Sequence, residues 1–348
     1  MSNTETPSTG TKLTRKDFLS SSEPRWCSGC GCYSTLNAVY KTFVASGLPR
    51  EQFALISGIG CSSRLPYYTN TYGFHTIHGR APTVAMGLKM VKPEQSVWIT
   101  TGDGDSLSIG GNHFIHLARK NPNIKLLLFN NQIYGLTKGQ VSPTSPLGST
   151  TKTTPYGSID RPLHPLTVAL GAGATFVARV PDNDNDMLFA AMEAAQKHEG
   201  VAIIEILINC VIFNDGVYQS LTDKESRPER TIKLEAGKPL LFGKNMDKGI
   251  RLRNDARPEV VQVGEGGVPL SEVLVHDPAN PNSGYAFMLA EMGGSEMPMP
   301  FGTLRAIKDH VHRPYQGQPT PEAYRKAMLG GNAWEIAEDS SIRVLTSE

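Results

Sequence analysis

The first two-thirds of the chain alternate between short apolar runs typical of buried strands and longer amphipathic stretches typical of helices. Strands are predicted at 53–58, 96–101, 124–129, 175–180 and 201–210, and helices at 33–46, 82–91, 107–120 and 186–198. Gly47 and Pro49 mark the end of the first helix, and Gly200 follows the last. Strands that alternate with helices indicate a mainly parallel sheet with helices on both faces, so the pattern predicts an α/β fold.

Three segments depart from this rhythm. Residues 1–20 are polar and rich in Ser and Thr, which predicts a flexible N-terminal arm. Residues 142–158 are mostly Ser, Thr, Pro and Gly, which predicts a surface loop; their position beside a candidate site favours a lid. After residue 225 the apolar pieces are short and Gly/Pro-rich. We therefore expect the site in residues 21–225, and in 226–348 an irregular extension that packs on the core or a partner subunit.

Composition excludes several classes of function. A net charge of +1 and a pI near 7.7 give no electrostatic basis for binding nucleic acid or an anionic membrane. No apolar window is long enough for a membrane span, and the N-terminus lacks a signal-peptide pattern, so we expect a cytoplasmic protein. The 5 cysteines are an odd number, which favours a reducing compartment and metal ligation over a disulfide framework.

Polar side chains follow two of the predicted strands. Asp103 lies between Gly102 and Gly104 directly after one strand, and Asn131 follows the next strand. The carboxyl ends of neighbouring parallel strands meet at one sheet edge, where ligands bind in open α/β folds. Carboxylate and amide oxygens suit Mg²⁺, and the glycines let backbone amides approach a diphosphate. A lone Gly-Asp-Gly is more often a turn, but the pairing with Asn131 makes the motif specific.

Four cysteines are placed to converge on the same edge. Cys27 and Cys30 form a Cys-x-x-Cys, Cys61 follows a predicted strand, and Cys210 ends another. Zinc is the default for four cysteines in an intracellular protein, so a non-catalytic, zinc-stapled assembly subunit is one interpretation. Their scattered positions and their convergence beside a diphosphate site favour a [4Fe–4S] cluster. Cys32 is interpreted as a small buried thiol.

The motifs WCSGCG, GIGCSSR, HTIHGRA, GDGDSLSIGGNH and NNQIYGLTKGQ together resemble the β subunit of 2-oxoacid:ferredoxin oxidoreductases, most closely the 2-oxoglutarate type, over about residues 20–225. The resemblance implies the thiamine-diphosphate-binding fold, with thiamine diphosphate, Mg²⁺ and one [4Fe–4S] cluster as cofactors. It also implies an α subunit that supplies the aminopyrimidine half of the thiamine site, in a dimer of αβ heterodimers. The expected reaction converts 2-oxoglutarate and coenzyme A to succinyl-CoA and CO₂, with electrons passing singly to ferredoxin, or runs as the reverse reductive carboxylation of the reductive TCA cycle.

The resemblance also implies roles for individual residues. The cluster ligands are Cys27, Cys30, Cys61 and Cys210, and the magnesium ligands are Asp103, Asn131 and the Ile133 carbonyl. Further contacts to the cofactor are expected from Ile59, Gly60, Cys61, Ser62, His78, Gly102, Gly104, Asp105, Gly135, Leu136 and Thr137.

Three residues are candidates for acting on the substrates. We expect Arg64 to bind a substrate carboxylate and His78 to contact the cofactor or substrate. The resemblance implies that Lys138 binds coenzyme A. The alternatives without a functional role are a structural salt bridge for Arg64, a hydrogen-bonded core histidine for His78 and a solvated loop lysine for Lys138. For the whole chain the alternatives are the same chemistry on pyruvate or another 2-oxo acid, and an iron-free thiamine decarboxylase.

Overall fold

The computed structural model describes residues 13–294, 296–312, 333–336 and 342–345. The chain divides into two compact units, Met1–His312 and Arg313–Glu348. The second unit contains a two-stranded antiparallel sheet of β12 (Ala333–Ile336) and β13 (Ile342–Leu345). Most of the expected N-terminal arm lies outside the described residues; its last part forms the short 3₁₀ turn η1 (Arg15–Phe18), and the Phe18 side chain is fully buried.

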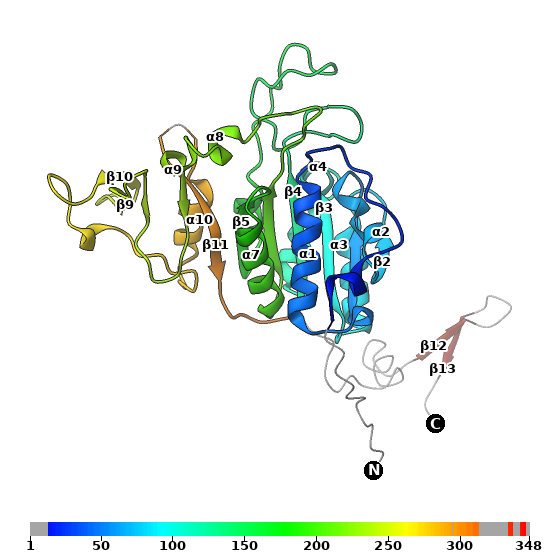
Figure 1. The fold of residues 1–348 in the computed structure, drawn as a ribbon. Coiled ribbons are helices and arrows are strands. Elements are labelled where there is room, and N and C mark those ends of the chain that lie inside the picture. Colours follow the sequence, from blue (N-terminus) through cyan, green and yellow to red (C-terminus); the bar gives the residue numbers. More distant parts are fainter. Residues whose placement is uncertain (1–12, 295, 313–332, 337–341, 346–348) are drawn as a thin grey trace. The chain divides into compact units, whose positions relative to one another are not determined.

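An eight-stranded sheet runs through the first unit in the order β2-β1-β3-β4-β6-β5-β11-β7 (Figure 1). Its strands are β1 (Phe53–Ser57), β2 (Tyr72–His75), β3 (Ser96–Gly102), β4 (Ile124–Asn130), β5 (Phe176–Pro181), β6 (Ala202–Leu207), β7 (Thr231–Lys233) and β11 (Met299–Ala306). The six strands from β2 to β5 are parallel. β11 then pairs antiparallel with β5, and β7 pairs parallel with β11. The mainly parallel α/β fold expected from the sequence is confirmed.

Helices cover both faces of this sheet. The longer ones are α1 (Cys32–Ser46), α3 (Ala81–Val91), α5 (Gly111–Lys120), α6 (Pro165–Gly171), α7 (Asn185–Lys197) and α10 (Ser283–Glu291). α1 and α7 pack together and share one hydrophobic core with the sheet, whereas α3, α5, α6 and α10 contribute to a second core. Short helices and 3₁₀ turns join them: η2 (Arg50–Gln52), η3 (Ser62–Arg64), α2 (Leu65–Tyr68), α4 (Asp103–Leu107), α8 (Gln219–Thr222), α9 (Arg227–Arg230) and η4 (Leu270–Glu272).

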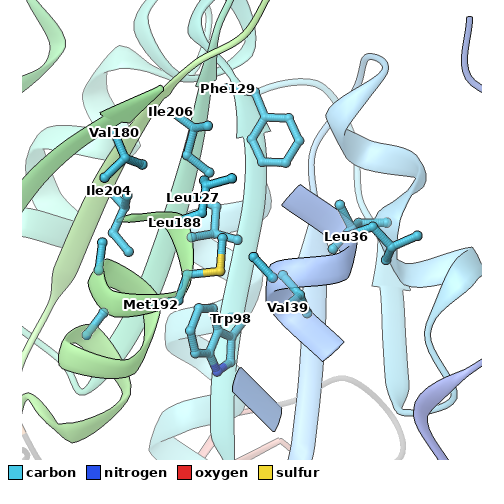
Figure 2. Packing of buried hydrophobic residues seen from close by; sticks show 14 of the residues in the cluster. Leu36, Val39, Trp98, Leu127, Phe129, Val180, Leu188, Met192, Ile204 and Ile206 are labelled. Atoms are coloured by element: carbon cyan, nitrogen blue, oxygen red, sulfur yellow. The ribbon is translucent and has the colours of Figure 1, made fainter. Parts of the chain in front are cut away.

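The core between the sheet and the α1–α7 pair shows why the strands are continuous apolar runs. Residues two apart, such as Leu127 and Phe129 of β4, point toward these helices, while Leu126 and Leu128 belong to the opposite core. Figure 2 shows the side chains on this face of the sheet packed against side chains of α1 and α7. The labelled side chains are almost fully buried: Leu36, Val39, Trp98, Leu127, Phe129, Val180, Leu188, Met192, Ile204 and Ile206.

Two sequence predictions are corrected by the structure. The helix expected over 107–120 begins only at Gly111, as α5. Leu107 instead ends α4, the chain turns at Ser108, and Gly110 packs so closely on the Asp105 carbonyl that a Cβ there would lie 2.3 Å from it. The strand expected to end at Cys210 ends at Leu207. The Asn209 amide donates to the Asp182 carboxylate at 2.9 Å instead of continuing the ladder, so Cys210 lies in a turn beyond the strand.

Residues after 225 add to the first unit. They supply β7 and β11 to the main sheet, and a separate three-stranded antiparallel sheet of β8 (Leu241–Phe242), β9 (Lys248–Leu252) and β10 (Pro258–Gln262). The first compact unit therefore runs to His312 and shows no boundary near 225. No helix among the described residues combines the length and the apolar character that crossing a bilayer requires.

Candidate active site

A cavity of about 650 Å³ opens at the carboxyl ends of β1, β3, β4 and β6. Every site residue predicted from the sequence lines it except Lys138. These are Cys27, Cys30, Ile59, Gly60, Cys61, Ser62, Arg64, His78, Gly102, Asp103, Gly104, Asp105, Asn131, Ile133, Gly135, Leu136, Thr137 and Cys210. Side chains that are up to 183 residues apart in sequence therefore meet at one edge of the sheet, as parallel topology requires.

Asp103 is a buried carboxylate at the first turn after β3. Its residue is 3% exposed, and the hydroxyls of Ser142 and Thr144 each donate to Oδ2 at 2.6 Å. Burial raises the pKa of Asp103, and no cationic side chain of the described residues offsets this. A buried carboxylate without a cationic partner suits a bound cation such as Mg²⁺.

Asn131 leaves β4, the strand next to β3, at the same edge. Its side-chain oxygen accepts a hydrogen bond from the Ile133 amide at 3.2 Å, and its main-chain carbonyl accepts one from the Asn214 amide group at 2.9 Å. These contacts fix the turn that follows β4. The carboxylate of Asp103, the amide of Asn131 and the carbonyl of Ile133 are hard oxygen donors around one cavity, so the donor set fits Mg²⁺.

Ser62 supplies a second indication of a bound ligand. The residue lines the cavity, and its hydroxyl is buried without a hydrogen-bond partner among the residues that the structure describes. A buried hydroxyl without a partner carries a free-energy cost that a phosphate or another polar ligand would remove.

His78 is oriented by Asp105. The Nδ1 atom of His78 lies 2.5 Å from Oδ1 of Asp105, which also accepts from the Gly79 amide at 2.7 Å, while Thr101 donates to Oδ2 at 2.7 Å. Since a carboxylate accepts, the proton sits on Nδ1 and the Nε2 atom of His78 is the nitrogen that can meet a ligand in the cavity. Asp105 therefore fixes the orientation of the His78 ring, and its predicted contact with the diphosphate stays a prediction.

The four candidate cluster cysteines line the same cavity as Asp103 and Asn131. Burial raises the pKa of Cys61, and the charges of Cys30, Cys210 and Cys27 raise it further. Within the described ranges, no group of three or more His, Cys, Asp and Glu side chains is arranged as a preformed metal site. The structure thus brings the four thiols to one cavity but does not by itself close them around a metal.

Cys32 is the fifth cysteine and is buried, with 2% exposure, as expected. A hydrogen bond from its thiol lowers the pKa of Cys30 to about 7, and the same bond, together with burial, raises the pKa of Cys32 well above its usual value. Cys30 therefore loses its proton more readily than an ordinary cysteine, and the thiolate is the form in which cysteine ligates metals.

Arg64 lines the cavity beside Arg25. Its Nη1 atom donates to the Arg25 carbonyl at 2.9 Å, and no acidic side chain in the described part of the chain pairs with it, so the salt-bridge alternative is not observed there. Lys138 lies on the exposed turn after Thr137 with a φ of 78° and does not line the cavity.

Several residues of the site were not predicted from the sequence. Tyr134 donates to the Gly104 carbonyl at 3.1 Å, and Trp26 donates through its indole to the Cys61 carbonyl at 2.8 Å. The hydroxyls of Ser142 and Thr144 donate hydrogen bonds to Asp103. The sequence showed only that their segment is rich in hydroxyl residues. Further lining comes from Arg25, Phe129, Gln140, Ile208, Asn209 and Val211.

Gly104→Ala is expected to disrupt the site. A Cβ at Gly104 would lie 2.2 Å from the Tyr134 ring, whereas a Cβ at Gly87, exposed within α3, meets nothing within 4 Å. We expect Gly104→Ala to lower stability by about 1–3 kcal/mol and weaken thiamine diphosphate binding. Gly87→Ala should gain up to about 1 kcal/mol. Chemical unfolding and cofactor titration check both; equal behaviour of the two variants would contradict the assigned packing of Tyr134.

Residues 58–206 match the family described as thiamine pyrophosphate enzyme, C-terminal TPP binding domain. The match runs from the end of β1 to β6 and so contains Cys61, Asp103 and Asn131. Fold, cavity and family match together define this part of the chain as a thiamine-diphosphate-binding domain.

Two relatives that are similar over longer stretches specify the class further. The chain is 47% identical over 312 residues to 2-oxoglutarate oxidoreductase subunit KorB of Mycobacterium tuberculosis, covering 90% of this chain and 82% of that protein. It is 40% identical over 199 residues to 2-oxoacid:ferredoxin oxidoreductase 2, subunit beta, of Aeropyrum pernix, covering 57% of this chain and 64% of that one.

A solved structure agrees with these relatives. It is described as 2-oxoglutarate:ferredoxin oxidoreductase from Magnetococcus marinus with 2-oxoglutarate, coenzyme A and succinyl-CoA bound; the TM-score is 0.68 and the identity 33%, over 92% of this chain and 91% of that chain. The chain belongs to the 2-oxoacid:ferredoxin oxidoreductase family as a β subunit. Thiamine diphosphate as a cofactor follows from that membership.

Proposed function

We propose that the chain is the β subunit of a 2-oxoglutarate:ferredoxin oxidoreductase. The proposed reaction converts 2-oxoglutarate, coenzyme A and two oxidised ferredoxins to succinyl-CoA, CO₂, a proton and two reduced ferredoxins. The same site can run the reverse reductive carboxylation. The enzyme would act in the cytoplasm as a dimer of αβ heterodimers, with the α subunit completing the thiamine site.

One observation carries this proposal: five cysteines, the four candidate cluster ligands and Cys32, line the same cavity as the magnesium-type donors Asp103 and Asn131. When bound, thiamine diphosphate supplies an electron sink for decarboxylation, and a [4Fe–4S] cluster at the four cysteines supplies one-electron acceptance. The cysteine thiolates would hold the cluster, while Asp103, Asn131 and the Ile133 carbonyl would hold Mg²⁺. Placing both sites in one cavity would let electrons leave the reacting carbon singly.

The proposed substrate rests on the cationic groups of the cavity. Arg64 and Arg25 line it, while its two aspartates accept hydrogen bonds from hydroxyls, a backbone amide and His78. 2-Oxoglutarate carries a second carboxylate that pyruvate lacks, and a guanidinium binds a carboxylate through paired hydrogen bonds. Of the other two candidates for acting on substrate, Lys138 is proposed to bind coenzyme A, and His78 is proposed to contact a ligand through Nε2.

Arg64→Met should discriminate between the substrates. We expect the KM for 2-oxoglutarate to rise about 10- to 100-fold, since a hydrogen bond to a charged group is lost, while turnover of pyruvate changes little. Arg119→Met is the matched control, because Arg119 is an exposed residue of α5 that does not line the cavity.

Initial rates of acyl-CoA formation in the complex with the α subunit measure both effects. A wild-type complex that prefers pyruvate, or an Arg64→Met complex that loses both substrates equally, would overturn the assignment of 2-oxoglutarate.

A further inference from the structure

The segment expected to form a lid, residues 142–158, begins with two hydroxyls that donate hydrogen bonds to Asp103, the candidate metal ligand. Ser142 and Thr144 are 8% and 3% exposed, and both donate to Asp103 Oδ2 at 2.6 Å. Ser145 secures the same turn, since its hydroxyl accepts from the Ser142 amide at 2.8 Å and donates to the Gln132 carbonyl at 2.6 Å. The start of this loop and the turn after β4 therefore form one hydrogen-bonded unit with Asp103.

A chain of buried hydrogen bonds, the Arg179–Glu205–Asn130 relay, also holds Thr144. The Thr144 hydroxyl lies 2.9 Å from Asn130 Oδ1, and Asn130 Nδ2 donates to Glu205 Oε1 at 2.8 Å. Glu205 in turn accepts from Arg179 Nε at 2.8 Å, and the side chains of this ion pair are 3% and 5% exposed. Because Asn130 must direct its NH₂ at the carboxylate, its oxygen must face Thr144.

The donor count favours a positioning role for Thr144. A hydroxyl carries one proton, and Thr144 has two acceptors within reach, Asp103 and Asn130. A carboxylate is the stronger acceptor of the two, so the proton goes to Asp103. The Thr144 hydroxyl therefore holds Oδ2 of Asp103, and Asn130 fixes the position of Thr144.

We propose that Thr144 and Ser142 are positioning residues for the magnesium–diphosphate site. They hold the Asp103 carboxylate in the orientation in which it meets the cation, and the Arg179–Glu205–Asn130 relay holds Thr144. The inference rests on the proposed function only in requiring Mg²⁺ and thiamine diphosphate at Asp103; it is independent of the iron–sulfur cluster and of the 2-oxo acid used.

The test is a magnesium titration of the complex with the α subunit, stripped with a chelator and held at saturating thiamine diphosphate. Calorimetry or intrinsic fluorescence reports binding without turnover. Thr144→Val removes the hydroxyl and keeps the shape, and we expect Mg²⁺ to bind 10- to 100-fold more weakly, as for other groups that orient a metal ligand. Thr144→Ser should restore affinity to within about threefold.

The matched control is Thr151→Val in the same loop, where the hydroxyl is exposed and lies only near that of Thr153, at 3.2 Å. Equal Mg²⁺ affinity in Thr144→Val and wild type would overturn the inference. A wild-type complex that binds no Mg²⁺ with thiamine diphosphate would instead overturn the proposed function. Should Thr144→Val not fold, Ser142→Ala takes its place, since Ser142 donates to the same oxygen; unchanged affinity there also overturns the inference.

Discussion

Cys210→Ser is expected to abolish ferredoxin reduction by the complex and leave thiamine diphosphate bound. Cys210 lines the cavity with Cys27, Cys30 and Cys61, and its Sγ would lie 3.4 Å from a Cβ placed on Gly135, in the turn that follows Asn131. A neutral hydroxyl is a poor substitute for a thiolate on iron. We therefore expect iron and sulfide to fall well below the content of the wild type, about four of each per chain. Metal analysis and ferredoxin reduction measure the two losses.

Cys32→Ser is the control for that experiment. Cys32 is buried next to Cys30, to which it donates a hydrogen bond, and serine keeps a donor at this position. The Cys32→Ser complex should retain iron and turn over. Full iron in Cys210→Ser, or loss of iron in Cys32→Ser alone, would show that the four ligands are assigned wrongly.

Asp103→Asn is expected to weaken the binding of Mg²⁺ and thiamine diphosphate by more than about 100-fold, a larger loss than for groups that only orient a ligand. Asparagine keeps the size and one acceptor for the Ser142 and Thr144 hydroxyls but loses the charge that meets the cation. Titration of the stripped complex measures the loss. Asp186→Asn is the control, because that carboxylate is almost fully exposed at the surface of α7.

The same substitution should not destabilise the metal-free protein. Burial raises the folded-state pKa of Asp103, so ionisation costs stability, and the metal-free wild type should lose stability as pH rises through that pKa. Asp103→Asn has no carboxyl to ionise at this position, so its stability should not fall in this way. The unfolding midpoint of the variant should therefore exceed that of the wild type by a margin that grows as pH rises. A variant that unfolds more easily than wild type at neutral pH would contradict the view that this carboxylate serves a cation.

The predicted strands that the structure contains are those with buried apolar runs on both faces. All residues of β1, β4, β5 and β6 are buried, which explains why their pattern was visible and why their ends lie within three residues of the prediction. β2 was not predicted because it has only four residues, all of them exposed. β11 was not predicted because Pro300 and Gly302 interrupt it, and it pairs through an irregular register with β5.

The site was predictable where chemistry requires a fixed motif. Asp103 and Asn131 follow neighbouring strands, and topology alone brings them together. The hydroxyls of Ser142 and Thr144 were not predictable, because their segment contains many similar side chains and only the folded loop selects two of them. His78 and Asp105 form a pair through a contact between the turn after β2 and α4, which no local pattern encodes.

The most direct test of the central claim is a metal and spectral analysis of the anaerobically purified complex of this chain with its α subunit. We predict about four irons and four sulfides per β chain, and a visible spectrum that bleaches partly on adding 2-oxoglutarate and further on adding coenzyme A. One zinc in place of iron, or an iron chromophore that responds to no 2-oxo acid, would contradict a cluster and a thiamine site that share one cavity.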